Sequence, residues 1–191
     1  MLTEILFATT NDIKLQEVRY IFSRKLPYIK ILSIQDLDIN LDNIECGDNY
    51  MNNAINKAKE IASKINIPVL TDDIGYEFKH LNHLPGLYKS NNPNSMISKK
   101  IKSDGSLVAY QCCAMVFKTN DDNINFYTFY REEGTVTNKI HGKSYDCWYM
   151  DLFIPKGKTK PYNRLGINAI CKYSARAKCV NQIIKYIKEY L

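Results

Sequence analysis

The sequence predicts a mixed α/β fold, and three observations lead to this prediction. A short apolar run at residues 5–8 is followed by a polar turn and then by a segment with helical periodicity. Much of the stretch from residue 107 to 154 is rich in the β-branched and aromatic residues that strands favour. An amphipathic helical pattern follows at residues 178–191. No internal repeat and no Gly/Ser/Pro linker interrupts this order, so we expect one continuous α/β unit.

The composition fits an ordinary globular protein. The chain has 191 residues, of which 45% are hydrophobic and 24% charged, enough to build one domain or two tightly joined lobes. No stretch approaches eighteen consecutive apolar residues, and the first residues lack a signal-peptide pattern. None of the six cysteines forms a C-x-x-C pair, and reduced thiols fit the cytosol. We therefore expect a cytoplasmic protein, with no disulfide between the vicinal Cys112 and Cys113.

The first element in chain order is a buried strand over residues 5–8. A helix follows, because Leu15, Val18 and Ile21 recur at helical spacing. The intervening turn, residues 9–12, reads Thr-Thr-Asn-Asp and has good N-cap chemistry. A strand, a turn and a helix N-terminus place backbone N–H groups where an anion could bind, with Lys14 in the first turn. The alternative to an anion-binding site is that this turn only caps an ordinary helix.

A second helix of about fifteen residues is expected next, and its apolar face consists of Ala54, Ala58, Ile61, Ala62 and Ile65. Asn53 and Lys57 are four residues apart and therefore share one face. An apolar strand then ends in Asp72 and Asp73. These carboxylates, with Glu45 upstream, form the oxygen-rich group that Mg²⁺ prefers, although an Asp-Asp pair is also a turn signal.

The middle of the chain is expected to form an antiparallel meander followed by another strand. The predicted strands cover residues 107–117, 125–130, 134–140 and 147–154. His80 and His83 are interpreted as surface or turn histidines, because no third ligand pattern lies nearby.

The net charge of +6 is concentrated in one part of the chain. Residues 156–191 contain nine Lys or Arg residues against Glu189 alone, which gives this segment a charge of +8. Such a segment can bind nucleic acid, a membrane surface or a phosphorylated ligand, or it can be a solvated helix face. No ribonucleoprotein motif, zinc finger or recognition helix is visible. We expect neither a nucleic-acid partner nor a membrane partner.

Several short motifs, taken in order, resemble the inosine triphosphate pyrophosphatase family, whose members hydrolyse non-canonical purine nucleoside triphosphates. The motifs are residues 7–14, 53–58, 70–75, 85–88, 153–155 and 174–178. The resemblance covers essentially the whole chain and implies a single nucleoside triphosphate pyrophosphatase domain over residues 1–191. It implies a two-lobed mixed α/β fold around a long curved central sheet, with an active-site cleft between the lobes. It also implies a homodimer and a requirement for Mg²⁺.

The resemblance assigns roles to individual residues. Glu45, Asp72 and Asp73 are similar to the family's metal ligands, and Asp73 also to the carboxylate that orients or deprotonates the attacking water. Thr9, Asn11 and Lys14 match the phosphate-binding pattern T-x-N-x-x-K. The full set of implied substrate-binding residues is Thr9, Asn11, Lys14, Lys57, Tyr149, Phe153, Ser174 and Arg176. Tyr149 and Phe153 could stack on the base, and core packing is the alternative for each.

The base-recognition motifs depart from the family. Ala175 stands where the family usually has His, and Ile170 where it has Lys. These are the groups that would donate to a 6-keto oxygen, so we expect a relaxed or altered base preference. Asp151, or Asp146 with an insertion, could replace the carboxylate of an aromatic-Asp-Pro motif.

The leading function is hydrolysis of NTP or dNTP, such as ITP, dITP or XTP, to the monophosphate and pyrophosphate. One alternative is a Maf-like pyrophosphatase for pyrimidine or modified nucleotides, suggested by the missing purine donors. Another is a nucleotide-binding protein that no longer catalyses.

Overall fold

The computed structural model describes residues 2–37, 47–83, 85–86, 106–120, 125–137 and 148–191. These residues form helices and a mixed sheet, which confirms the predicted α/β class. The chain divides into two compact units. Unit 1 consists of Met1–Asp73, Cys113–Tyr130 and Arg176–Leu191, and unit 2 consists of Ile74–Cys112 and Arg131–Ala175.

The sheet contains parallel and antiparallel pairs in the strand order β2-β1-β3-β5-β6-β7, with β4 paired to β3. Strand β1 is parallel to β2 and to β3, whereas β4 is antiparallel to β3 and β7 to β6. The strands are β1 Glu4–Phe7, β2 Lys30–Ser33, β3 Val69–Phe78, β4 Pro85–Gly86, β5 Ser106–Lys118, β6 Asn125–Thr137 and β7 Phe153–Pro155.

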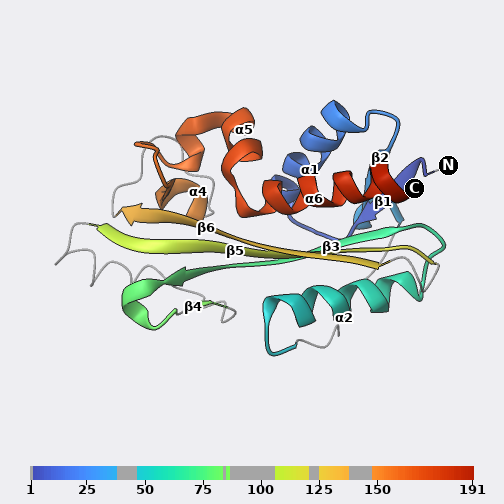
Figure 1. Cartoon of the computed structure of the whole chain (residues 1–191), viewed down its shortest axis with the longest axis horizontal. Helices are drawn as coiled ribbons and strands as arrows, with labels where there is room; N and C mark the ends of the chain where they lie inside the picture. Colours follow the sequence, from blue (N-terminus) through green and yellow to red (C-terminus); the bar gives the residue numbers. More distant parts are fainter. Residues whose placement is uncertain (1, 38–46, 84, 87–105, 121–124, 138–147) are drawn as a thin grey trace. The chain divides into compact units, whose positions relative to one another are not determined.

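Unit 1 holds three long helices: α1 Asp12–Lys25, α2 Tyr50–Ala62 and α6 Ala175–Tyr190. The first residue of α6, Ala175, is counted with unit 2, because the third segment of unit 1 starts at Arg176. In Figure 1, α1 and α6 lie on one side of the unit 1 strands and α2 lies on the other. The Lys25 Nζ atom donates to Asn181 Oδ1 at 2.6 Å and links α1 to α6. The Thr71 hydroxyl donates to the Ala54 carbonyl at 2.7 Å and links β3 to α2. Two helical layers therefore enclose the strands of this unit.

Unit 2 contains helices α4 Trp148–Leu152 and α5 Tyr162–Tyr173 together with parts of the long strands. A buried glutamine, Gln111 of β5, lies at its centre. The Gln111 side-chain amide donates to the Tyr76 hydroxyl, and its carbonyl accepts from the Tyr162 hydroxyl and the Ala175 backbone N–H. Because these groups are buried, their mutual hydrogen bonds avoid the cost of unsatisfied polar atoms.

Three predicted strands differ in the structure. Residues 125–130 and 134–140 were expected to be separate strands, but β6 runs without a break from Asn125 to Thr137. The charged residues between them belong to the strand, and Arg131 and Glu133 form ion pairs with Glu77 and Lys156. The strand predicted over residues 147–154 is also wrong, because Trp148–Leu152 is helical and the strand covers Phe153–Pro155. Aromatic content favoured a strand there, and tertiary packing overrode that preference.

The cysteines of the described segments agree with the prediction of reduced thiols. Cys112, Cys113, Cys171 and Cys179 form no disulfide. Cys113 lies beside Cys179 of α6, whereas Cys112 interacts with Glu77, and burial together with Glu77 raises the pKa of the Cys112 thiol to about 12. The two vicinal side chains thus have different surroundings, as expected for neighbours on a strand.

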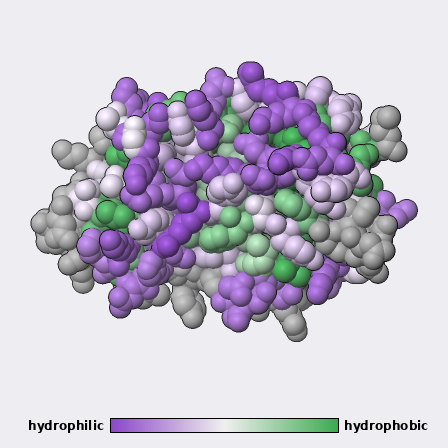
Figure 2. Space-filling model, in the orientation of Figure 1, coloured by the Kyte–Doolittle hydropathy of each residue, from purple (hydrophilic) through white to green (hydrophobic). Residues whose placement is uncertain are grey.

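Apolar residues are dispersed on the one face that Figure 2 shows. Figure 2 shows small green groups among purple hydrophilic residues on the face seen in Figure 1. Within the part of the chain that the structure describes, no helix is both long enough and apolar enough to span a bilayer.

Replacing Gly134 by Ala should destabilise the protein by about 1–3 kcal/mol, because the added methyl group overpacks unit 2. A Cβ atom at Gly134 of β6 would clash with the Ile154 carbonyl oxygen and would approach the Phe153 ring carbons to 2.5 Å and 2.9 Å. Thermal unfolding should show the loss, and the control is Glu133→Ala at the partly exposed neighbouring position, which loses only a surface ion pair with Lys156. Equal melting temperatures for the two variants would contradict this packing.

Candidate active site

The turn between β1 and α1 has the capping geometry predicted from the sequence. Asn11 is the N-cap of α1, and its side-chain oxygen accepts the Lys14 backbone N–H at 3.1 Å. The Thr9 hydroxyl oxygen accepts the Asn11 backbone N–H at 3.1 Å. The Thr9 hydroxyl and the Asn11 amide NH₂ are side-chain donors that can point at an anion near this helix N-terminus.

Asp72 is the centre of a buried group of charges in unit 1. Its Oδ1 accepts from Lys14 Nζ and its Oδ2 from Arg176 Nε, both at 3.0 Å. Arg176 Nη1 donates to Glu17 Oε2 at 2.5 Å. We call Lys14, Glu17, Asp72 and Arg176 the Asp72 network. From α2, Lys57 Nζ donates to the Asp72 backbone carbonyl at 2.9 Å.

The charges around Asp72 favour its ionised form. Burial opposes ionisation, but the cations of Lys14, Arg176 and Lys57 outweigh this effect and hold the pKa of Asp72 well below its ordinary value. Burial also lowers the pKa of Lys14, which Asp72 partly offsets. Lys14, Lys57 and Arg176 face two buried carboxylates, Asp72 and Glu17, so the group has a formal charge of +1 before the neighbouring Asp73 is counted.

Asp73 follows directly in β3 and has different neighbours. It is half-buried, and its Oδ2 accepts from Asn53 Nδ2 at 2.7 Å. Asn53 and Lys57 both reach β3 from α2, which confirms that they share one helix face. The alternative that the Asp-Asp pair marks a turn is wrong, because both residues lie inside the strand.

The two aspartates differ in how well they fit a magnesium ion. Both Asp72 oxygens already accept hydrogen bonds from cationic side chains, and the residue has no exposed surface. Asp73 is more accessible, and Mg²⁺ commonly uses one or two carboxylates with water and substrate phosphates. Glu45 lies outside the described residues. Among those described, no group of three His, Cys, Asp or Glu side chains could hold a metal.

The two residues predicted to stack on the base, Tyr149 and Phe153, belong to unit 2 and not to the Asp72 network. Phe153 is fully buried in unit 2, where its ring stacks on Tyr162 at 5.6 Å and meets Tyr76 edge-on at 5.3 Å. These contacts support the core-packing alternative for Phe153. Tyr149 belongs to α4, but its side chain lies outside the described part of the structure.

The remaining base-recognition positions of unit 2 that the structure describes are buried. Ser174 caps α5, and its backbone N–H donates to the Ile170 carbonyl at 2.9 Å. Ala175 is fully buried and supplies no side-chain donor. Asp151 is 3% exposed and accepts from Asn163 Nδ2 at 3.0 Å, whereas Asp146 lies outside the described residues.

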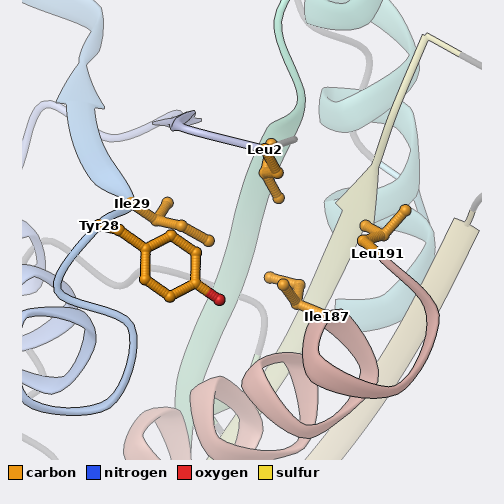
Figure 3. Close-up of a pocket in the computed structure, with 5 residues that line it drawn as sticks. All are labelled: Leu2, Tyr28, Ile29, Ile187 and Leu191. Atoms are coloured by element: carbon orange, nitrogen blue, oxygen red, sulfur yellow. The ribbon is translucent and has the colours of Figure 1, made fainter.

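An apolar hollow in unit 1 has chemistry unsuited to a triphosphate. It has a volume of about 300 Å³, and Figure 3 shows the five side chains that line it. The Tyr28 hydroxyl is the one polar side-chain group among them, and none is charged. The lining residues are Leu2, Tyr28, Ile29, Ile187 and Leu191.

Glu17 is the residue of the network that sequence reasoning missed. It lies among the apolar positions of α1, and its side chain is 2% exposed. Lys14, Glu17 and Ile21 follow the spacing i, i+3, i+7, which places them along one face of the helix. A carboxylate beside the apolar face of a helix was therefore the sequence signal for a buried charge. Its partner could not be read from the sequence, because Arg176 is 159 positions away.

The lowered pKa of Asp72 predicts a loss of stability in acid. This group contributes fully above its unfolded pKa of about 3.8. As the pH falls through 3.8 towards the native value, only the unfolded chain takes up the proton, so the free energy of unfolding decreases by up to about 1.4 kcal/mol per pH unit. Urea unfolding between pH 5 and pH 3 should show a steeper decline for the wild type than for Asp72→Asn. Parallel declines would contradict the assignment.

Comparison with known proteins gives the family. The model of the Ham1 family matches residues 5–186. The chain belongs to the Ham1 family. This membership confirms the resemblance inferred from the motifs.

Ham1 relatives match along nearly their whole length. This chain is 26% identical to a dITP/XTP pyrophosphatase of Porphyromonas gingivalis, over 96% of this chain and 97% of the relative. It is 28% identical to a dITP/XTP pyrophosphatase of Wigglesworthia glossinidia brevipalpis, over 97% of each. The Ham1 protein of Staphylococcus aureus has the same fold, with a TM-score of 0.76 at 22% identity, covering 98% of this chain and 100% of that one.

Proposed function

We propose that this chain hydrolyses non-canonical purine nucleoside triphosphates, such as dITP and XTP, to the monophosphate and pyrophosphate. The observation that carries the proposal is the grouping of Lys14, Lys57 and Arg176 around Asp72, next to the half-buried Asp73. Ham1 membership and the relatives named dITP/XTP pyrophosphatases support the same reaction.

In this mechanism unit 1 binds the triphosphate. The Thr9 hydroxyl, the Asn11 amide and the ammonium groups of Lys14 and Lys57 neutralise and orient the phosphates. Asp73, held by Asn53, accepts a proton from the water that attacks the α-phosphorus. The bond from the α-phosphorus to the bridging oxygen breaks, and pyrophosphate leaves.

A magnesium ion fits this mechanism through Asp73 together with phosphate oxygens and water, and when bound it supplies charge neutralisation for the leaving pyrophosphate. We assign Asp72 instead to holding the cations, because both its oxygens accept hydrogen bonds from them. Glu45 remains a predicted ligand.

Base selectivity should be relaxed in this proposal. Ala175 offers no donor to a keto oxygen, so discrimination should be weaker than in a site that hydrogen-bonds the base. We further propose one pyrophosphatase domain over residues 1–191, active as a homodimer in the cytoplasm.

The test is pyrophosphate release with Mg²⁺ from dITP, XTP, ATP, GTP and the pyrimidine triphosphates. Release from dITP and XTP well above ATP and GTP is the expected result. A pyrimidine-biased profile would favour the Maf-like alternative, and tight nucleotide binding without release would favour a silent nucleotide-binding protein.

A further inference from the structure

Glu17 is a buried carboxylate with no place in the reaction described so far. It lies on α1 with 2% of its side chain exposed, and a buried charge is costly unless it is paired. Its partner Arg176 is equally buried, with 2% exposed. Two nitrogens of this guanidinium, Nε and Nη1, donate to Asp72 and Glu17, so the arginine is tied to two buried carboxylates.

The contacts of the Asp72 network form a closed cycle. Glu17 accepts from Arg176, Arg176 donates to Asp72, and Asp72 accepts from Lys14. Lys14 and Glu17 are three residues apart on α1, so the helix backbone closes the cycle. One helix thus holds both ends of a chain of ion pairs that passes through β3 and α6.

Lys14 is the most exposed member of this cycle. Its side chain is 17% exposed, against 1% for Asp72 and 2% for Glu17 and Arg176. The three other members are almost completely buried, so Lys14 is the member of the network that a ligand can most readily approach.

Glu17 also determines how Arg176 meets Asp72. Arg176 donates to Asp72 through Nε and to Glu17 through Nη1. When the second acceptor loses its negative charge, as in Glu17→Gln, the arginine favours a bidentate pair with the one remaining carboxylate. Such a pair would occupy both Asp72 oxygens and compete with Lys14 for Oδ1.

We propose that Glu17 is a positioning residue for Lys14: through Arg176 and Asp72 it fixes the ammonium group that binds the triphosphate. Arg176 acts in the same way and does not contact the base. The proposal rests on the proposed function in one respect, that Lys14 binds phosphate.

The test uses Glu17→Gln, with Ile21→Val one turn further along α1 as the matched control for a small loss of packing. Affinity for inorganic tripolyphosphate without Mg²⁺ is measured by calorimetry. We expect about tenfold weaker binding in Glu17→Gln and unchanged binding in the control. In a Lys14→Met background, Glu17→Gln should weaken binding by less than about twofold, because the two changes act on one pathway.

Kinetics then separate positioning from base contact. The kcat/KM of Glu17→Gln should fall by the same factor for dITP and for GTP. A changed dITP-to-GTP ratio would overturn the proposal, as would unchanged tripolyphosphate affinity or full additivity with Lys14→Met. If Glu17→Gln does not fold, the same measurements are made on Arg176→Lys. This variant keeps the positive charge but loses the planar guanidinium that joins Glu17 to Asp72.

The binding and kinetic experiments distinguish a failure of the proposed function from a failure of the proposed role of Glu17. A wild-type chain that binds tripolyphosphate but hydrolyses no nucleotide would overturn the proposed function, while the binding measurements would still decide the role of Glu17. A wild-type chain that binds no tripolyphosphate would overturn the role of Glu17 as well.

Discussion

The Asp73→Asn variant should still bind the nucleotide through Lys14 and Lys57 but hold Mg²⁺ more weakly, and it should release pyrophosphate about 10²–10⁴-fold more slowly than the wild type. The amide cannot accept the proton of the attacking water. It can still accept the hydrogen bond from Asn53 Nδ2, so the local fold of β3 should persist. Turnover of dITP, or of the best substrate found in the panel, gives kcat, and equilibrium binding of a non-hydrolysable analogue gives the affinity.

The matched control for Asp73→Asn is Glu189→Gln, which neutralises a carboxylate at the exposed end of α6. Its kcat should equal that of the wild type. An Asp73→Asn variant with full activity would exclude Asp73 as the proton acceptor and would remove the main support for the mechanism.

The Arg176→Met variant should lose about 3–5 kcal/mol of unfolding free energy, because it leaves two buried carboxylates without their shared cation. Glu17 and Asp72 are 2% and 1% exposed, so water cannot replace the guanidinium without opening the core of unit 1. Urea unfolding followed by circular dichroism at pH 7 measures the loss.

For this variant the control is Lys188→Met, the same type of change at an exposed position of α6. It should alter the unfolding free energy by less than about 0.5 kcal/mol. If the two variants were equally stable, Arg176 could not be the cation that holds Glu17 and Asp72 in the core.

The phosphate-binding part of the site could be predicted because its signals are local. Thr9, Asn11 and Lys14 fall within six residues, and capping chemistry fixes their relation to one helix N-terminus. Asp72 and Asp73 are adjacent at the predicted strand, so their placement needed no knowledge of the remaining chain.

The connections between distant segments could not be predicted. A single sequence does not say which buried carboxylate meets which guanidinium, and Glu17 and Arg176 are 159 positions apart. The turn expected between the two halves of β6 was wrong for a related reason. The charged residues there have partners on β3 and after β7, and those pairings are set by tertiary structure.

The division of the chain into units has a consequence for folding. Unit 1 is assembled from three separated segments, and its last segment begins at Arg176. During synthesis Lys14, Glu17 and Asp72 are made early, but Arg176, the cation that Glu17 and Asp72 share, is made only after residue 175. Contacts between such distant positions slow folding, because the closure of a long loop precedes any gain from the contact. A nascent chain interrupted before α6 would therefore carry three charged side chains of the site without the arginine that joins them.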